Sequence, residues 1–293
     1  MTRTRHTLAA HDGHALTAYC HEPAQAARAH LVIGPAMAVP QSFYADFAAF
    51  LAGQGYRVWT FDYRGMGESR HGPRRACSAN ITDWITQDYD AVLHHASAAR
   101  DGLPLFVLGH SLGGQTVPLL PSIDKVSGVV NIAVGSGALR HNQPGVRRMA
   151  PLLWHVFTPL LCPVFGYFPG TRIGVVGDIP RRAMYQWRRW CLQPEYLLQG
   201  EPGARDAYAR VRLPVLGLTF SDDELLLEAG SKMLHDAYRD AEVDYRVLSP
   251  GQFGLKRIGH FGFFRREQET ILWPLVSDWL GQRCAAAALR STV

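Results

Sequence analysis

Short apolar runs rich in β-branched and aromatic residues alternate with amphipathic stretches along most of the chain, and this alternation restricts the possible folds more than any other feature. The strand-like runs lie at 30–34, 56–61, 104–108, 126–133 and 213–219. Helix-like stretches at 41–54 and 81–99 separate some of them and carry apolar residues on one face. Strands that alternate with helices predict an α/β fold with a mainly parallel central sheet flanked by helices.

The first strands depart from this pattern. Two strand-like segments, near 5–10 and 14–21, are joined by Asp12-Gly13, a dipeptide typical of a two-residue hairpin turn. A hairpin pairs its strands in antiparallel fashion. We therefore expect an antiparallel edge on an otherwise parallel sheet.

A long insertion interrupts the alternation after Gly137. About 75 residues rich in Pro, Trp and Arg follow without strand periodicity, until strands resume near Leu213. An insertion of this length is usually an active-site lid rather than a plain loop. We expect a core at 1–137 and 211–284, a helical cap at 138–210 and a flexible tail at 285–293.

The predicted cap carries the excess positive charge of the protein. Between Ala138 and Arg210 the sequence has ten arginines and four acids, a net charge of +6, whereas the whole chain carries +5. A basic segment of this kind either attracts anions or forms a solvated face, and both interpretations stay open. Nucleic acid is not an expected partner, because the arginines lie among apolar and aromatic residues and no nucleic-acid-binding motif occurs.

Residues 149–168 form an apolar stretch of about the length of a membrane-spanning helix. Pro151, Pro159 and Pro163 each remove a backbone donor from it, so a helix exposed to lipid would be costly. We predict a kinked apolar cap and no membrane span. Because the N-terminus lacks the apolar run of an export signal and the five cysteines are scattered, we also expect a cytoplasmic protein without disulfides.

The segment Gly109-His110-Ser111-Leu112-Gly113 matches the pattern G-x-S-x-G. In this motif a strained turn between a strand and a helix lifts the serine hydroxyl clear of the sheet, and glycines are needed where the chain segments crowd together. The motif is informative here because it follows the strand-like run 104–108 and opens a helix-like segment at 112–120. We predict that Ser111 is a nucleophile.

A nucleophilic serine needs a histidine base and an acid that orients it, in the chain order serine, acid, histidine. Carboxylates follow the strand at 213–219, where Asp222 and Asp223 both qualify as the acid. Of the thirteen histidines, His260 lies between two glycines after these acids, whereas His235 lies in a helix-like run. We therefore predict His260 as the general base.

An oxyanion hole requires two backbone N–H groups directed at the oxygen that becomes negatively charged. The first is expected from Leu112, next to the serine. The second is expected from the loop Gly34-Pro35-Ala36-Met37, and because proline has no N–H the donor is Ala36 or Met37, with Met37 preferred. No metal-ligand cluster or phosphate-binding glycine loop is evident, so no metal and no cofactor are expected.

These residues resemble the α/β-hydrolase superfamily over essentially the whole chain. The segment from Phe61 to Ser69 is similar to its D-x-R-G-x-G-x-S motif. Four further segments, Gly34-Pro35-Ala36-Met37, the run from Phe220 to Glu224, the run from Ile258 to Phe264 and the cap sequence Gln186-Trp187-Arg188-Arg189-Trp190, resemble a bacterial family of predicted α/β hydrolases. That family is related to serine aminopeptidase and monoacylglycerol-lipase-like enzymes. The resemblance implies the α/β-hydrolase fold and assigns the acid to Asp223, one residue after Asp222.

The predicted activity is hydrolysis of a carboxylic ester or thioester through an acyl-enzyme on Ser111. A peptidase or amidase, a lactonase and an acyltransferase would use the same three residues and stay as alternatives. A non-catalytic binding protein that has kept the fold is the alternative from another class. The expected partner is a small acyl substrate, and the sequence sets neither its acyl and alcohol groups nor the oligomeric state.

Two sets of cap residues are candidate substrate contacts. Arg181, Arg182, Arg188 and Arg189 would bind an anionic group of the substrate, with a solvated surface as the alternative. Trp187 and Trp190, three residues apart on a helix, would either contact the substrate or anchor the cap on the core, and we favour anchoring.

Overall fold

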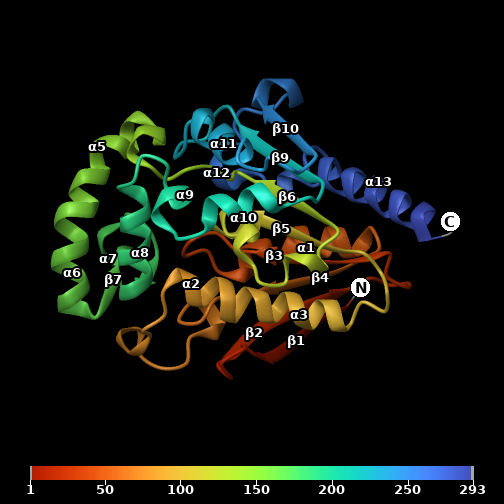
Figure 1. Ribbon diagram of the computed structural model, residues 1–293, viewed down its shortest axis with the longest axis horizontal. Helices are drawn as coiled ribbons and strands as arrows, with labels where there is room; N and C mark the ends of the chain where they lie inside the picture. Colours follow the sequence, from red (N-terminus) through yellow and green to blue (C-terminus); the bar gives the residue numbers. More distant parts are fainter. Residues whose placement is uncertain (1, 292–293) are drawn as a thin grey trace.

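An eight-stranded sheet runs through the centre of the computed structural model, which describes residues 2–291 (Figure 1). The strand order is β1-β2-β4-β3-β5-β6-β9-β10. The strand bounds are β1 Thr2–Ala9, β2 Ala15–Glu22, β3 Ala29–Gly34, β4 Tyr56–Phe61, β5 Leu105–His110, β6 Gly128–Ile132, β9 Val215–Phe220 and β10 Val243–Leu248. β2 pairs antiparallel with β1 and β4, and all other pairs in the sheet are parallel. The predicted fold class and antiparallel edge are confirmed.

The turn of the edge hairpin differs from the prediction. Ala10 and His14 still pair through a backbone hydrogen bond of 2.8 Å, so the loop contains three residues, 11–13, rather than two. Gly13 takes the left-handed conformation, with φ at +85°. This is the usual form of a three-residue hairpin loop, in which a glycine closes the turn.

Helices cover both faces of the sheet (Figure 1). The core helices are α1 Ala45–Gly53, α2 Ile81–Asp83, α3 Asp90–Ala98, α4 Leu112–Gln115, α11 Glu228–His235, α12 Gly259–Gly262 and α13 Trp273–Ser291. A π-helical segment, Trp84–Tyr89, joins α2 to α3, so the helix expected at 81–99 is continuous but irregular. Helix α4 is short, since a 3₁₀ turn containing Pro118 follows it.

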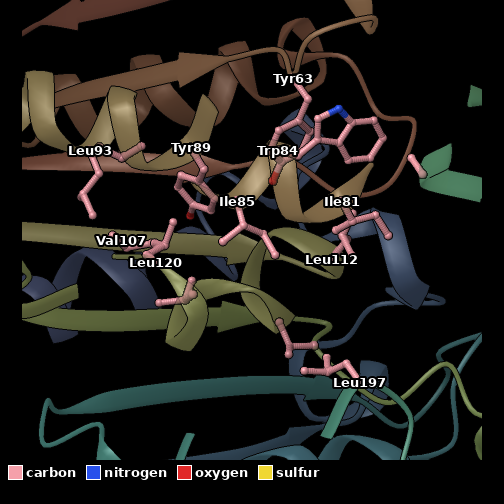
Figure 2. Packing of buried hydrophobic residues seen from close by; sticks show 14 of the residues in the cluster. Tyr63, Ile81, Trp84, Ile85, Tyr89, Leu93, Val107, Leu112, Leu120 and Leu197 are labelled. Atoms are coloured by element: carbon pink, nitrogen blue, oxygen red, sulfur yellow. The ribbon is translucent and has the colours of Figure 1, made fainter. Parts of the chain in front are cut away.

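The sheet separates two hydrophobic clusters, and alternate residues of one strand enter different clusters. In β5, Phe106 and Leu108 pack with Phe47 of α1 and Trp273 of α13. Val107 belongs to the opposite cluster. Figure 2 shows Ile85, Tyr89 and Leu93 directed toward Val107 and Leu120 on that side. Full burial of each such side chain contributes roughly 1.5–3 kcal/mol to folding, which fixes the strand that leads to Ser111.

The segment between β6 and β9 contains the helices of the predicted cap, several of which lie beyond one end of the sheet (Figure 1). Its helices are α5 Pro144–Leu152, α6 Thr158–Phe165, α7 Gly170–Ile173, α8 Arg181–Cys191, α9 Leu197–Gly200 and α10 Ala204–Arg210. It also contains a small antiparallel sheet that was not predicted, formed by β7 (Tyr167–Pro169) and β8 (Asp178–Pro180). Trp154 and Trp190 of the cap belong to the same hydrophobic cluster as Val107 of the core.

Two predictions for individual segments have different outcomes. The apolar stretch 149–168 bends through a π-helical segment between α5 and α6, and within residues 2–291 no helix is long and apolar enough to cross a membrane. Helix α13 continues to Ser291, and the flexibility expected of residues 285–293 stays a prediction. Alanines favour the helical conformation, and four of them lie at 285–288. Residues 292–293 lie outside the described residues.

Candidate active site

Ser111 lies between the end of β5 and the start of α4 in a strained backbone conformation. Its φ is +49° and its ψ is −116°, a combination that non-glycine residues rarely adopt. A Cβ atom on Gly109 would lie 2.1 Å from the Cα of Gly114, and one on Gly113 would lie 2.1 Å from the carbonyl oxygen of Gly34. The glycines of the motif are therefore required by close approach of neighbouring backbone.

His260 and Asp223 are hydrogen-bonded to each other. The distance from His260 Nδ1 to Asp223 Oδ2 is 2.7 Å, and only 3% of each side chain is exposed. The other oxygen of Asp223 accepts the backbone N–H groups of Leu225 and Leu226, at 2.8 and 2.9 Å. Because an ionised carboxylate only accepts hydrogen bonds, Nδ1 of His260 carries the proton and Nε2 is left as the basic nitrogen.

The carboxylates on either side of Asp223 hold the backbone of the histidine loop. Asp222 accepts the N–H groups of Ile258 at 2.8 Å and Gly259 at 3.1 Å, whereas Glu224 accepts the N–H of His260 at 2.9 Å. Asp223, and not Asp222, contacts the imidazole. The sequence analysis considered Asp222 only as a competing acid and missed its hydrogen bonds to the backbone of the histidine loop. A run of three carboxylates after one strand is unusual and could have indicated such a role.

A buried chain of hydrogen bonds connects three segments around Ser111. The N–H of Ala36 donates to Tyr44 Oη at 2.9 Å, the Tyr44 hydroxyl lies 2.9 Å from His110 Nδ1, and His110 Nε2 lies 3.0 Å from the carbonyl oxygen of His260. A carbonyl only accepts, so Nε2 is the protonated nitrogen of His110 and Tyr44 donates to Nδ1. Burial holds the pKa of His110 well below its usual value, so this imidazole stays neutral.

The hydrogen bond of Ala36 bears on the choice between the two predicted second donors of the oxyanion hole. The N–H of Ala36 donates to Tyr44, so this N–H is not available to a substrate. Met37 lines the same cavity as Ser111, as does Leu112, the first residue of α4. The first N–H groups of a helix have no acceptor within the helix, which suits Leu112 to the role of donor.

The cavity that contains Ser111 and His260 has a volume of about 540 Å³. Its remaining wall is formed largely by the cap and is mostly apolar. The apolar cap residues in this wall are Val146, Met149, Ala150, Leu153, Trp154, Phe157, Ile173, Val175, Val176, Trp187 and Cys191. No Asp or Glu is among the described residues that line it. The arrangement suits a serine nucleophile acting on a substrate with an apolar portion.

The candidate cap contacts are divided between this cavity and other places. Trp187 lines the cavity and donates to Tyr196 Oη at 3.1 Å, whereas Trp190 is fully buried and donates to Glu201 at 3.0 Å, as an anchor does. Arg188 donates to the carbonyl oxygen of Trp154 at 2.6 Å.

The paired arginines predicted to contact substrate do not line the Ser111 cavity. Arg181, Arg182 and Arg189 line a separate cavity on the other side of α8. Among residues 2–291, no group of three or more histidine, cysteine or acidic side chains is placed to hold a metal ion.

A family model and two named relatives match parts of this chain. Residues 25–168 match the family described as serine aminopeptidase S33. A protein of Schizosaccharomyces pombe named as a predicted monoglyceride lipase is 34% identical over 111 residues, which are 38% of this chain and 25% of that protein. The phospholipase ABHD3 of Mus musculus is 43% identical over 62 residues, 21% of this chain and 14% of that protein. The chain thus spans a quarter or less of the length of these relatives.

Solved structures match over nearly the whole chain. A soluble variant of monoglyceride lipase from Saccharomyces cerevisiae, in complex with a substrate analogue, has a TM-score of 0.70 and 17% identity, with 96% of both chains covered. The esterase domain of a Rhodothermus marinus protein has a TM-score of 0.60 and 17% identity, with 96% of this chain and 97% of that chain covered. At this level of identity the likeness shows the fold.

Proposed function

Because the chain is an α/β hydrolase related to the serine aminopeptidases and to monoglyceride-lipase-like enzymes, we propose that it hydrolyses carboxylic esters through an acyl-enzyme on Ser111. The observation that carries this proposal is the hydrogen bond of 2.7 Å between His260 and Asp223 beside the cavity that contains Ser111. It orients the imidazole and leaves Nε2 as the basic nitrogen.

The proposed reaction has two steps. His260 Nε2 takes the proton from Ser111 as its Oγ attacks the ester carbonyl, and the N–H groups of Leu112 and Met37 stabilise the oxyanion. His260 then gives the proton to the leaving alkoxide, and the alcohol departs. In the second step His260 takes a proton from water and the hydroxide attacks the acyl-enzyme. The bond to Ser111 Oγ then breaks, His260 returns the proton to this oxygen, and the acid is released.

The character of the cavity supports an ester or thioester with an apolar acyl group. Burial of a substrate methylene against a wall of aliphatic and aromatic side chains favours binding by roughly 0.8 kcal/mol. An aminopeptidase would need a carboxylate for the free amine of its substrate, and none of the described residues around the cavity supplies one. Lactone opening and acyl transfer use the same three residues and stay as alternatives.

The test is covalent labelling with a fluorophosphonate, followed by turnover of p-nitrophenyl esters, matched acyl thioesters and an aminoacyl amide. We expect Ser111 to be labelled, the Ser111→Ala variant to show neither labelling nor turnover, and the esters and thioesters to be cleaved in preference to the amide. Labelling that persists in Ser111→Ala would remove this residue as the nucleophile. Absence of turnover with every substrate in a labelled wild-type protein would favour a binding role.

A further inference from the structure

A second cavity, with a volume of about 670 Å³, lies between helix α8 of the cap and the segment 75–82 that leads into α2. Four arginines line it, Arg75, Arg181, Arg182 and Arg189. Neutral hydrogen-bonding side chains share its wall: Ser78, Asn80, Thr82, Tyr185 and Gln186. No acidic residue is among its described lining residues. Four cations in one concave site produce a strongly positive local potential.

Three of these arginines have no carboxylate partner within residues 2–291. Arg189 pairs with Glu201 at 3.0 Å, whereas Arg75, Arg181 and Arg182 form no ion pair. The neighbouring Arg74 differs from them, because it pairs with Asp178 at 3.0 Å and does not line the cavity. Of the four arginines that line the cavity, three are therefore left without an internal anion among the described residues.

Helix α8 adds to the positive potential. Its eleven residues begin at Arg181, follow Pro180 without a side-chain cap, and have no acid in the first turn. A helix N-terminus carries partial positive charge, so arginines in its first turn are electrostatically unfavourable. A bound anion would reverse this cost, because it would accept first-turn N–H groups and neutralise both side chains.

The cavity is distinct from the Ser111 cavity, since the two share no lining residue. Helix α8 separates them, with Arg181, Arg182 and Arg189 toward one cavity and Trp187 and Cys191 toward the other. The opposite wall is fixed to α8 by Gln186, whose Oε1 accepts the backbone N–H groups of Ile81 at 2.7 Å and Thr82 at 3.2 Å. The walls are therefore held together before any ligand binds.

We propose that this cavity binds the phosphate group of an anionic ligand, either a free phosphate monoester or a lipid headgroup. A single carboxylate matches one guanidinium fork, whereas three unpaired guanidinium groups around one space match the oxygens of a doubly charged phosphate. The ligand would contact the outer side of the helix whose inner side lines the substrate cavity. This binding does not depend on the proposed esterase activity.

The test is calorimetric titration of the full chain with inorganic phosphate at low ionic strength. Arg181→Gln/Arg182→Gln should weaken binding by about tenfold or more, because each charge-assisted hydrogen bond is strong. The matched control is Arg147→Gln/Arg148→Gln, which removes the same charge from exposed positions of the cap outside the cavity. It should change the affinity by less than about twofold, since exposed charges at a distance are screened. Equal loss in both variants, or no binding by the wild type, would overturn the proposal.

Two further measurements complete the test. Arg75→Gln removes a charge from the opposite wall and should also weaken binding, which guards against a local effect on α8. Flotation with phosphatidylcholine vesicles, with and without phosphatidic acid, identifies the source of the phosphate. Retention only by phosphatidic acid vesicles, lost in Arg181→Gln/Arg182→Gln, would support a headgroup, whereas phosphate binding without retention would support a free monoester. Vesicle retention that all variants share, together with no response to inorganic phosphate, would contradict the cavity as the site.

Discussion

The two halves of the Ser111 cavity are built on different physical principles. On the core side, buried hydrogen bonds link His260 to Asp223 and, through Tyr44 and His110, to the loop at Ala36. On the cap side the wall is apolar, and the exposed large apolar side chains of residues 2–286 lie on the cap. They are Met149, Leu152, Val156, Leu160, Val164 and Val175. Chemistry at a fixed atom needs directional bonds, whereas accommodation of an acyl chain needs only burial, which has no direction.

The difference predicts that substitutions on the two sides affect different kinetic parameters. A lost hydrogen bond on the core side misplaces the reacting groups and lowers kcat. A lost apolar contact on the cap side weakens substrate binding and the discrimination between acyl chains. The following predictions test this division, and they run from the largest expected effect to the smallest.

The strongest test of the core side is Asp223→Asn. An amide would favour the wrong tautomer of His260 and would not stabilise the imidazolium, so kcat should fall by roughly 10³–10⁴. Asp222→Asn keeps one acceptor for the loop N–H groups and should lower kcat by no more than about tenfold. Steady-state kinetics on one ester measures both, and a larger loss for Asp222→Asn would transfer the role of the acid to Asp222.

Tyr44→Phe tests the hydrogen-bond chain. It leaves the N–H of Ala36 and the lone pair of His110 Nδ1 unpaired in a buried place, at a cost of roughly 1–3 kcal/mol. Because Ala36 precedes the proposed oxyanion donor, kcat should fall by about tenfold or more while KM changes less. Tyr56→Phe is the matched control, since it removes a buried hydroxyl that donates to Ser277 far from Ser111. A similar kcat in the two variants would make the chain purely structural.

The cap side is tested with a series of esters of increasing acyl length. For the wild type, kcat/KM should rise by about fourfold for each additional buried methylene, until the cavity is filled. Met149→Ser should flatten this rise, because Met149 lines the cavity. Val164→Ser is the control, an exposed apolar residue of the cap outside the lining, and should leave the series unchanged. A flat series in the wild type would reject the apolar acyl site.

Acid should destabilise the core through buried histidines. Burial lowers the pKa of His21, His30 and His235 from 6.5 to about 4, and all three lie on core elements. Below pH 6.5 the unfolded chain binds protons that the folded chain does not, so stability falls as pH drops from about 6.5 to 4.

At pH 5 the lowered pKa of His235 alone should reduce the free energy of unfolding by roughly 2 kcal/mol relative to pH 7. His235→Asn retains a donor for the carbonyl of Ser231 but cannot titrate, so the fall in Tm between pH 7 and 5 should be smaller than in the wild type. His155→Asn, on the exposed surface of the cap, should leave that fall unchanged. An equal fall in His235→Asn and wild type would contradict this role for His235.

The sequence predicted the features that depend on local pattern. Alternating apolar runs predicted strands of the central sheet, and glycines flanking Ser111 and His260 marked the turns that carry them. The contact of Asp223 with His260 agrees with the residue that the family resemblance preferred. These features are accessible because periodicity and turn chemistry act over a few residues.

Features that depend on distant contacts were not accessible in the same way. Tyr44 and His110 are 66 residues apart, and nothing in the local sequence of either marks the other as its partner. The predicted arginine pairs illustrate the same limit, because their clustering was visible but the cavity that Arg181 and Arg182 face depends on Arg75, from another part of the chain. Pairings of this kind follow from the closed fold and not from composition.

The hydrophobic cluster shared by cap and core has a consequence for how the protein unfolds. Trp154, Met184 and Trp190 of the cap belong to one cluster with Trp84 and Val107, so the cap has no separate interior of its own. A segment without its own interior cannot melt independently while the core stays intact, and its loss would expose tryptophans that the core now covers. The protein should therefore denature in a single cooperative transition, and a foreign cap grafted at its borders would need to reproduce this tryptophan packing before it could fold.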